Sequence, residues 1–329
     1  MKRDSIVVMA LAASAWGCHS EPPLPIPERA GGAVWIDADP AIGLPFKDVD
    51  DGYALVHALY RYPNSIRGIS LGHGNTNDLD YQEEVTRALI ANYSANTGFP
   101  VTRGAEKPGH FDDSAAARAI RQALAEEELT FLALGRLTTI AQVLAHDSSL
   151  AKKAKELVIL GGNRAEGRPT FGPQAIVFPD SNLEGDFDAV EALMATSVPI
   201  ALIATELTAQ VTLTASDLDA LAARGNAGAY LAKASRPWLE LSTVFVQEPG
   251  FHPFDLMVTA YADDALRPYF RCEAMLAQVV RGPDPSFKRR PGELRALVVS
   301  PTFTNGRPVR YCSGLRDDAK RHMLARLVP

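Results

Sequence analysis

The sequence predicts an α/β fold in which an open, mostly parallel β-sheet is flanked by helices. Apolar runs rich in β-branched residues alternate with helical patterns along most of the chain, as in parallel strands joined by crossover helices. Polar residues and glycines follow several of these runs, at the positions where open parallel sheets bind ligands. The chain has 329 residues, of which 47% are hydrophobic, so it can bury a full core as one large domain.

The expected elements follow from these patterns in chain order. Strands are predicted at residues 33–38, 67–72, 130–135, 156–162 and 198–204. Helical patterns lie between them at residues 50–60, 80–96 and 138–156. Beyond about residue 270, shorter strands at 272–280, 293–301 and 307–313 precede a closing helix at 317–327, which predicts a small C-terminal β/α excursion.

The first 32 residues are expected to lie outside this domain. Residues 1–18 have a basic start, an apolar stretch from Ile6 to Ala15 and small residues before Cys18, which is typical of an export signal. The stretch resembles a bacterial lipoprotein signal, and lipidated Cys18 would then tether a membrane-anchored or periplasmic protein. Cleavage by an ordinary signal peptidase and a cytoplasmic N-terminus are the alternatives. Residues 19–32 read as a proline-rich tether, and residues 33–329 as the folded domain.

Charge and cysteine content narrow the range of partners. The formal net charge is -6, with acidic and basic residues mixed along the chain and no basic stripe, which excludes nucleic acid as a partner and favours a small molecule. Cys272 and Cys312 either pair in an oxidising compartment or are buried as unpaired thiols. No Cys/His spacing indicates zinc.

Polar residues and glycines gather where the predicted strands end and where one helix begins. They are Asp37 and Asp39, His73 and Asn75, Gly135, then Gly161, Gly162 and Asn163, with Asp50 and Asp51 at the start of a helix. The carboxyl ends of parallel strands meet at one edge of the sheet, so these side chains are expected to share one crevice. Backbone N–H groups at the helix start favour the two acidic residues there.

Carboxylates that share a crevice repel one another unless a cation or a proton lies between them. Asp39 and Asp51 are expected to be such a pair. Their carboxylate oxygens are hard ligands, which suit calcium first and magnesium second. An EF-hand is excluded, because Ile42 stands where that loop requires glycine. Asp48, next to the "GLPFK" turn, is expected to be a solvated surface residue.

From about residue 33 to about residue 265, these motifs resemble the inosine-uridine nucleoside hydrolases. The stretch "DADPAIGLPFKDVDDGYA" is similar to the family's opening signature, with a seven-residue insertion before the aspartate pair. Further matches in family order are "GISLGHGN", "TRGAEKP", "ALGRLTTIA", "ELVILGGN", "DSNLEGDFDAVEAL", "LIATELTAQ" and "FDLMVTAYA". The resemblance implies a calcium-dependent N-ribohydrolase on an open α/β sheet, which uses a calcium-bound water to split ribonucleosides into ribose and base. It also implies a homodimer or a homotetramer.

The resemblance assigns roles residue by residue. Asp39 matches the general base, which also touches the cation. The metal ligands would be Asp39, Asp51, Asp255 and the backbone carbonyl of Leu134. The residues that bind the ribose would be Asp50, Asn75, Asp180, Asn182 and Asp255. Asp37 matches the outer aspartate of the cluster.

The leaving-group end departs from the family's pattern. Many members carry a histidine immediately before the last metal aspartate, and this chain has Phe254 there. His252 is the candidate acid for the departing base, with a structural loop histidine as the alternative. Trp238 is the candidate for stacking on the base, together with Tyr230 and Phe245, and ordinary core packing is the alternative for all three. The sequence leaves the preferred nucleobase open.

Two other functions compete with hydrolysis. The run "VWIDADPA" also looks like the first motif of haloacid-dehalogenase-type phosphatases, but Ala41 stands where that family has threonine or valine, and the matches at Asn75, Asn182 and Asp255 have no place there. The second is a protein that binds ribose with calcium and has lost turnover. The departure at Phe254 and the inserted loop motivate that alternative.

Overall fold

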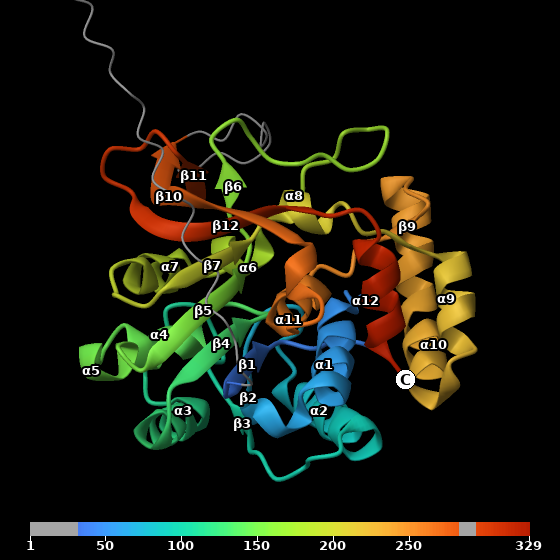
Figure 1. The fold of residues 1–329 in the computed structure, drawn as a ribbon, viewed down its shortest axis with the longest axis horizontal. Coiled ribbons are helices and arrows are strands. Elements are labelled where there is room, and N and C mark those ends of the chain that lie inside the picture. The colour runs from blue at the N-terminus through green and yellow to red at the C-terminus, as the bar shows by residue number, and fades with distance from the viewer. Residues whose placement is uncertain (1–31, 283–293) are drawn as a thin grey trace, which may run out of the picture.

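The structure, a computed structural model, describes residues 32–282 and 294–329 and centres on one ten-stranded sheet. The strand order is β3-β2-β1-β4-β5-β7-β12-β10-β11-β6, and β8 with β9 forms a separate two-stranded sheet. Figure 1 shows helices on both faces of the large sheet. The expected export signal, Cys18 and the proline-rich tether lie outside the described residues.

The first six strands of the order form the parallel part of the sheet. They are β1 (Val34–Ala38), β2 (Ile66–Leu71), β3 (Val101–Arg103), β4 (Leu129–Ala133), β5 (Ala154–Leu160) and β7 (Ile200–Ile203). All neighbouring pairs among them run parallel, which confirms the predicted sheet. The sequence did not reveal β3, because a three-residue edge strand with one buried residue carries no periodic pattern.

The C-terminal strands do not stand apart from this sheet. They are β10 (Phe270–Gly282), β11 (Leu294–Ser300) and β12 (Arg307–Leu315), and β12 pairs in parallel with β7 while β10 pairs antiparallel with both β12 and β11. The short strand β6 (Asn163–Arg164) then pairs with β11 at the edge. The excursion therefore extends the main core. Cys272 and Cys312 lie opposite each other on β10 and β12 and form a disulfide, which decides between the two possibilities for these cysteines.

Helices cover the two faces of the sheet in two groups. One group comprises α1 (Asp50–Arg61), α2 (Leu79–Tyr93), α11 (Leu256–Ala262) and α12 (Ala319–Leu327), with α9 (Ala215–Ala222) and α10 (Gly225–Leu241) beyond them; the other comprises α3 (Ala115–Glu126), α4 (Thr138–Leu144), α5 (Ser148–Ala151) and α7 (Phe187–Met194) (Figure 1). Short helices α6 (Ser181–Glu184) and α8 (Thr205–Thr208) follow β6 and β7. Within the described part of the chain, no helix is both long and apolar enough to cross a bilayer.

The helix predicted over residues 138–156 is two helices, α4 and α5. Asp147 separates them, because its carboxylate accepts hydrogen bonds from the backbone N–H groups of Ser149 and Leu150 and so caps a new helix. The last residues of the predicted helix already belong to β5, which begins at Ala154. The sequence pattern merged a helix, a cap and a strand start into one run.

Candidate active site

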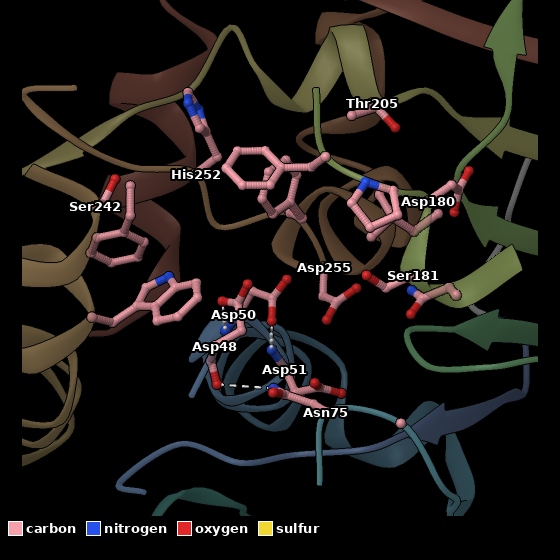
Figure 2. A pocket seen from close by; sticks show the side chains of 18 of the residues that line it. Asp48, Asp50, Asp51, Asn75, Asp180, Ser181, Thr205, Ser242, His252 and Asp255 are labelled. Atoms are coloured by element: carbon pink, nitrogen blue, oxygen red, sulfur yellow. Dashed lines mark hydrogen bonds between the residues drawn. The ribbon is translucent and has the colours of Figure 1, made fainter. Parts of the chain in front are cut away.

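A cavity of about 560 Å³ lies at the carboxyl ends of the parallel strands, as the clustered polar residues predicted. Its two ends differ in chemistry. Five aspartates line one end, which we call the acidic floor: Asp39, Asp48, Asp50, Asp51 and Asp255. Six aromatic rings line the other end, which we call the aromatic wall: Phe171, Phe178, Trp238, Phe245, Phe251 and Phe254. Figure 2 shows Asp48, Asp50 and Asp51 gathered below and His252 above them.

Asp39 is held at the end of β1 by a side chain of α1 and by the backbone that follows β2. Its own N–H donates to Asp51 Oδ1 at 3.0 Å, and the N–H of Asn75 donates to Asp39 Oδ2 at 2.8 Å. Gly74 and Gly135 leave room for the carboxylate, since a Cβ on Gly74 would lie 1.4 Å from Asp39 Oδ2. The β2 and β4 ends therefore fix this carboxylate in one position.

Asp50, Asp51 and Asp255 bring carboxylate oxygens within 4.8 Å of one another. The first two occupy the opening turn of α1, where the helix dipole favours them, and Asp255 is the residue before α11. All three are buried. Asp255 Oδ1 has no hydrogen-bond partner among the residues that the structure describes. A buried, unpartnered carboxylate oxygen beside two further carboxylates fits a hard cation with oxygen ligands.

The electrostatics of the floor agree with that fit. Burial raises the pKa of Asp39 to about 6, although the N–H of Asn75 acts in the opposite direction. Burial, followed by repulsion from Asp39 and Asp50, raises the pKa of Asp51 well above its ordinary value. The same causes raise the pKa of Asp255. Without a cation, these groups are driven to bind protons instead. The acidic floor is thus a site that can hold a metal ion.

Two of the residues predicted to bind the ribose, Asp180 and Asn182, come from the start of α6. Asn182, on α6, donates from its side-chain amide to the Leu134 carbonyl and lines the cavity. Asp180 also lines the cavity, but its carboxylate caps α6 and accepts the N–H of Gly162 at 2.9 Å. Burial raises the pKa of Asp180 to about 6. Gly161 has φ +129°, and a Cβ there would lie 2.6 Å from Asp180 Oδ2.

The expectation for Asp48 was wrong. Asp48 lines the cavity, because the inserted loop folds back onto the site: the Lys47 ammonium donates to the Asn75 carbonyl at 2.7 Å. The Asp48 carboxylate accepts the backbone N–H of Val49 at 2.7 Å, and the Asp48 carbonyl accepts the side-chain amide of Asn75 at 3.0 Å. The insertion therefore builds part of the acidic floor and positions Asn75.

At the aromatic wall, the candidate residues separate into two groups. Trp238 and Phe245 line the cavity, and their stacking on a base stays a prediction, whereas Tyr230 packs against Tyr93 with ring centroids 6.3 Å apart and is not a lining residue. His252 lines the cavity, but both of its ring nitrogens have partners. Nδ1 lies 3.0 Å from the Val211 carbonyl and Nε2 lies 2.6 Å from Glu248 Oε2.

Several lining residues were not predicted from the sequence. Arg136 lines the cavity and donates to His73 Nδ1 at 2.8 Å; its place directly after a strand-end glycine was a signal that could have found it. Phe171, Phe178 and Glu248 come from irregular segments, and no local pattern marks them.

Comparison with known proteins agrees with this geometry. The sequence profile described as inosine-uridine preferring nucleoside hydrolase matches residues 34–307. Uridine nucleosidase 1 of Arabidopsis thaliana is 27% identical over 214 residues, which are 56% of this chain and 59% of that protein, so the match spans less than two thirds of its length. The non-specific ribonucleoside hydrolase RihC of Salmonella newport is 28% identical over 60% of this chain and 69% of its own.

Solved structures share the fold. An inosine-uridine preferring nucleoside hydrolase from Bacillus anthracis superposes with a TM-score of 0.68 at 18% identity, covering 90% of this chain and 98% of the other.

Proposed function

The chain belongs to the inosine-uridine preferring nucleoside hydrolase family, and from this premise we propose that it hydrolyses the N-glycosidic bond of ribonucleosides to release ribose and a free base. One observation carries the proposal: Asp39, Asp51 and Asp255, far apart in the sequence, line one cavity that has an aromatic opposite end. A sugar diol suits the acidic end and a planar base suits the aromatic end.

The phosphatase alternative fails on the position of its nucleophile. That residue would be Asp37, whose carboxylate accepts a hydrogen bond from Ser70 and which is not among the residues that line the cavity. Burial raises the pKa of Asp37 to about 8, which leaves it a poor nucleophile at neutral pH.

We propose calcium as the cation. Asp39, Asp51, Asp255 and the carbonyl of Leu134 would hold it, because all four offer hard oxygen atoms. The three aspartates line the acidic floor, and the Leu134 carbonyl accepts from Asn182, which lines the same cavity. Asp50 joins Asp51 and Asp255 in the group whose oxygens lie within 4.8 Å of one another. When bound, the ion supplies Lewis-acid chemistry that lowers the pKa of a water and compensates the floor's negative charge.

The chain's own residues supply the other steps of the proposed mechanism. Asp39, fixed by Asn75 and Asp51, takes the proton of the attacking water. Asp50, Asn75, Asn182 and Asp255 are proposed to bind the ribose hydroxyls, with Asp180 at the same end of the cavity. The carboxylates also stabilise the positive charge that develops on the sugar as the C–N bond breaks. Proton donation from His252 to the base stays a prediction.

One assay tests the proposal. The protein is incubated with a panel of purine and pyrimidine ribonucleosides, with calcium and after chelation, and free ribose is measured. We expect calcium-dependent release that Asp39→Asn abolishes, with Asp188→Asn, an exposed carboxylate on α7, as a matched control. No release from any nucleoside would contradict the proposal. Calcium-dependent ribose binding without base release, measured by calorimetry, would favour the binding protein instead.

Export and assembly are also proposed. The Cys272–Cys312 disulfide supports an oxidising compartment, in line with the pattern of residues 1–18. Fractionation of cells that express the full chain, with Cys18→Ala to separate a lipid tether from a soluble periplasmic form, tests this. Light scattering tests the homodimer or homotetramer that the family resemblance implies.

A further inference from the structure

Two segments that are distant in sequence form much of the aromatic wall. Residues 171–178 contribute Phe171 and Phe178 to the wall, and residues 242–248 contribute Phe245, with Val246 beside it as an aliphatic lining residue. The first segment closes on itself through paired backbone hydrogen bonds between Phe171 and Ile176 at 2.8 and 2.9 Å. The second is a π-helical turn, Ser242–Val246, that continues α10 and leaves Phe245 66% exposed. Each segment presents aromatic rings, and neither belongs to the sheet.

Glu248 joins the two segments. Its Oε1 accepts the backbone N–H of Gly172 at 2.9 Å, and its Oε2 lies 2.6 Å from His252 Nε2. The segments touch at the same place: Gly172 has φ +64°, and a Cβ there would lie 1.9 Å from the Val246 carbonyl oxygen. Only glycine permits so close an approach of the two backbones. The Glu248 side chain is 17% exposed, so these bonds are largely shielded from water.

Both ring nitrogens of His252 are engaged by the protein. A carbonyl oxygen can only accept, so the Val211 carbonyl requires a proton on Nδ1. Nε2 lies 2.6 Å from Glu248 Oε2, in a pair whose side chains are only 8% and 17% exposed. Because neither ring nitrogen is free, His252 cannot donate to a base while this pair is intact.

On the basis of the proposed function, we propose that Glu248 is a positioning residue that clasps the two aromatic segments over the base end of the cavity, with His252 as its hydrogen-bond partner. In this role the pair sets how tightly the base is held between aromatic faces. It replaces the proton donation that the sequence suggested for His252. Because the aromatic wall recognises the face of a base rather than its edge, we expect purines and pyrimidines both to be accepted.

Hydrogen exchange tests the clasp without reference to activity. In Glu248→Ala, exchange of the amides in residues 171–178 should rise by about tenfold or more, the usual effect of losing a charge-assisted hydrogen bond. Glu248→Gln should restore protection, because a glutamine oxygen accepts from Gly172 and its amide donates to a neutral His252. Glu240→Ala removes an exposed charge from α10 and serves as the matched control. Unchanged exchange in a folded Glu248→Ala would overturn the proposal.

Kinetics separate the clasp from proton donation. We compare a natural ribonucleoside with p-nitrophenyl β-D-riboside, whose leaving group departs without a proton. The clasp predicts that Glu248→Ala and His252→Gln raise KM for both substrates by about tenfold, the effect of about 1.4 kcal/mol, with little change in kcat. A loss of kcat confined to the natural nucleoside would overturn the clasp and establish His252 as the acid. If the wild type cleaves neither substrate, the proposed function fails, whereas the exchange experiment still tests the clasp.

Discussion

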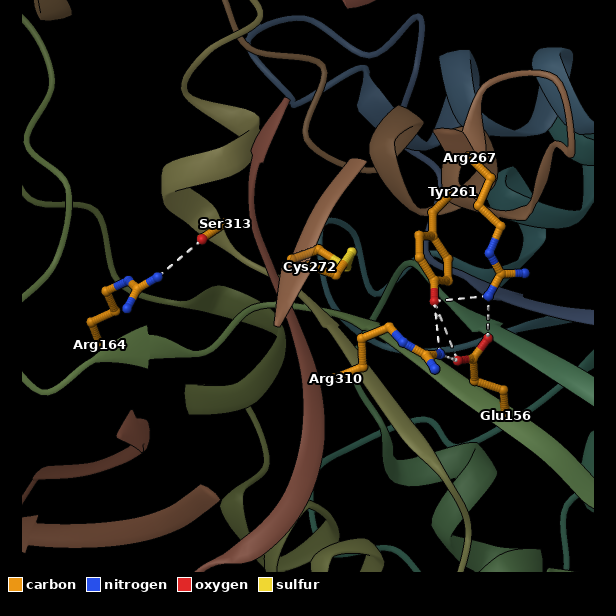
Figure 3. Close-up of a disulfide and its surroundings, with 8 residues drawn as sticks. Glu156, Arg164, Tyr261, Arg267, Cys272, Arg310 and Ser313 are labelled. Carbon is orange, nitrogen blue, oxygen red and sulfur yellow. Dashed lines mark hydrogen bonds and ion pairs between the residues drawn. A yellow bond between two sulfur atoms is a disulfide. The ribbon is translucent and has the colours of Figure 1, made fainter. Parts of the chain in front are cut away.

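The two ends of β5 carry buried charge in opposite arrangements. Glu156, near its start, lies 2.6 Å from Arg310 and 3.5 Å from Arg267, and both arginines also donate to the Tyr261 hydroxyl (Figure 3). The far end of β5, at Leu160 and Gly161, lines the cavity of the acidic floor, where carboxylates face one another and Asp255 Oδ1 has no partner among the described residues. Both groups are buried. Glu156 is compensated by opposite charges, although Arg267 Nε and Nη1 have no hydrogen-bond partner among the described residues. The carboxylates of the floor repel one another. A carboxylate compensated within the chain serves the fold, and carboxylates that repel one another serve a ligand.

The largest effect is expected from neutralising one carboxylate of the acidic floor, which tests whether the floor serves activity and not the fold. Asp39→Asn should lower kcat/KM for ribonucleosides by about 10² to 10⁴, because the proposed base can no longer take a proton. The melting temperature should stay the same or rise, since a repelled carboxylate has been removed. Ribose release and calorimetry on the same preparation check both parts. A large drop in melting temperature would mean that the floor also serves the fold.

Neutralising Glu156 should give the reverse pattern. Glu156→Gln leaves Arg267 and Arg310 buried without their carboxylate, which should cost about 3–5 kcal/mol of unfolding free energy. Below the melting temperature, kcat should be unchanged. Urea unfolding measures the loss, and Glu166→Gln, at an exposed site, is the control that should change stability by less than about 0.5 kcal/mol. Lost activity in a folded Glu156→Gln protein would contradict the assignment of the Glu156 network to the fold and of the acidic floor to the ligand.

The stabilisation of the protein by calcium should depend on the acidic floor and not on the Glu156 network. At 100 times its dissociation constant the ion should stabilise the wild type by about 2.7 kcal/mol, because it binds only the folded chain. Asp255→Asn should remove most of this response, whereas Glu156→Gln, although less stable, should keep it. Thermal unfolding at increasing calcium concentration measures both variants. An equal response in Asp255→Asn would place the ion elsewhere.

The floor was largely predictable from the sequence, because its residues follow apolar runs whose type and direction local patterns reveal. Asp39, Asn75 and Asp51 sit at strand ends or a helix start, and parallel topology alone brings such positions together. Asp48 was misjudged, since no local pattern says whether an inserted turn folds toward a site or away from it.

Apart from the candidates Trp238 and Phe245, the aromatic wall and the compensated network were not predictable, because they depend on contacts between distant residues. Glu248 and Gly172 are 76 positions apart, and Glu156 and Arg310 are 154 apart. No periodic pattern or characteristic spacing in the sequence indicates either contact. A buried charge next to its counter-charge looks in the sequence like any surface residue.

The smallest expected effect concerns how the free energy of unfolding depends on pH, because Asp263 and Asp180 should contribute with opposite signs. Burial alone would raise the pKa of Asp263, but contacts with His57 and Arg326 outweigh it and hold the pKa below its ordinary value of 3.8. Asp263 therefore contributes stability above about pH 4 that is lost as the pH falls further. Burial raises the pKa of Asp180 from 3.8 to about 6, so its contribution is lost as the pH rises between these values.

Replacing each of these two aspartates with asparagine should reveal the opposite slopes of unfolding free energy against pH. Asp263→Asn should reduce the loss of unfolding free energy below pH 4, whereas Asp180→Asn should reduce the loss between pH 4 and pH 6 in metal-free protein. Urea unfolding at pH 3, 4, 5, 6 and 7 measures both. The Asp263 carboxylate is hydrogen-bonded to Arg326, whereas the Asp180 carboxylate accepts from backbone N–H groups and burial outweighs the charge of Arg168. Slopes of the same sign would mean that compensation within the chain does not distinguish scaffold from site.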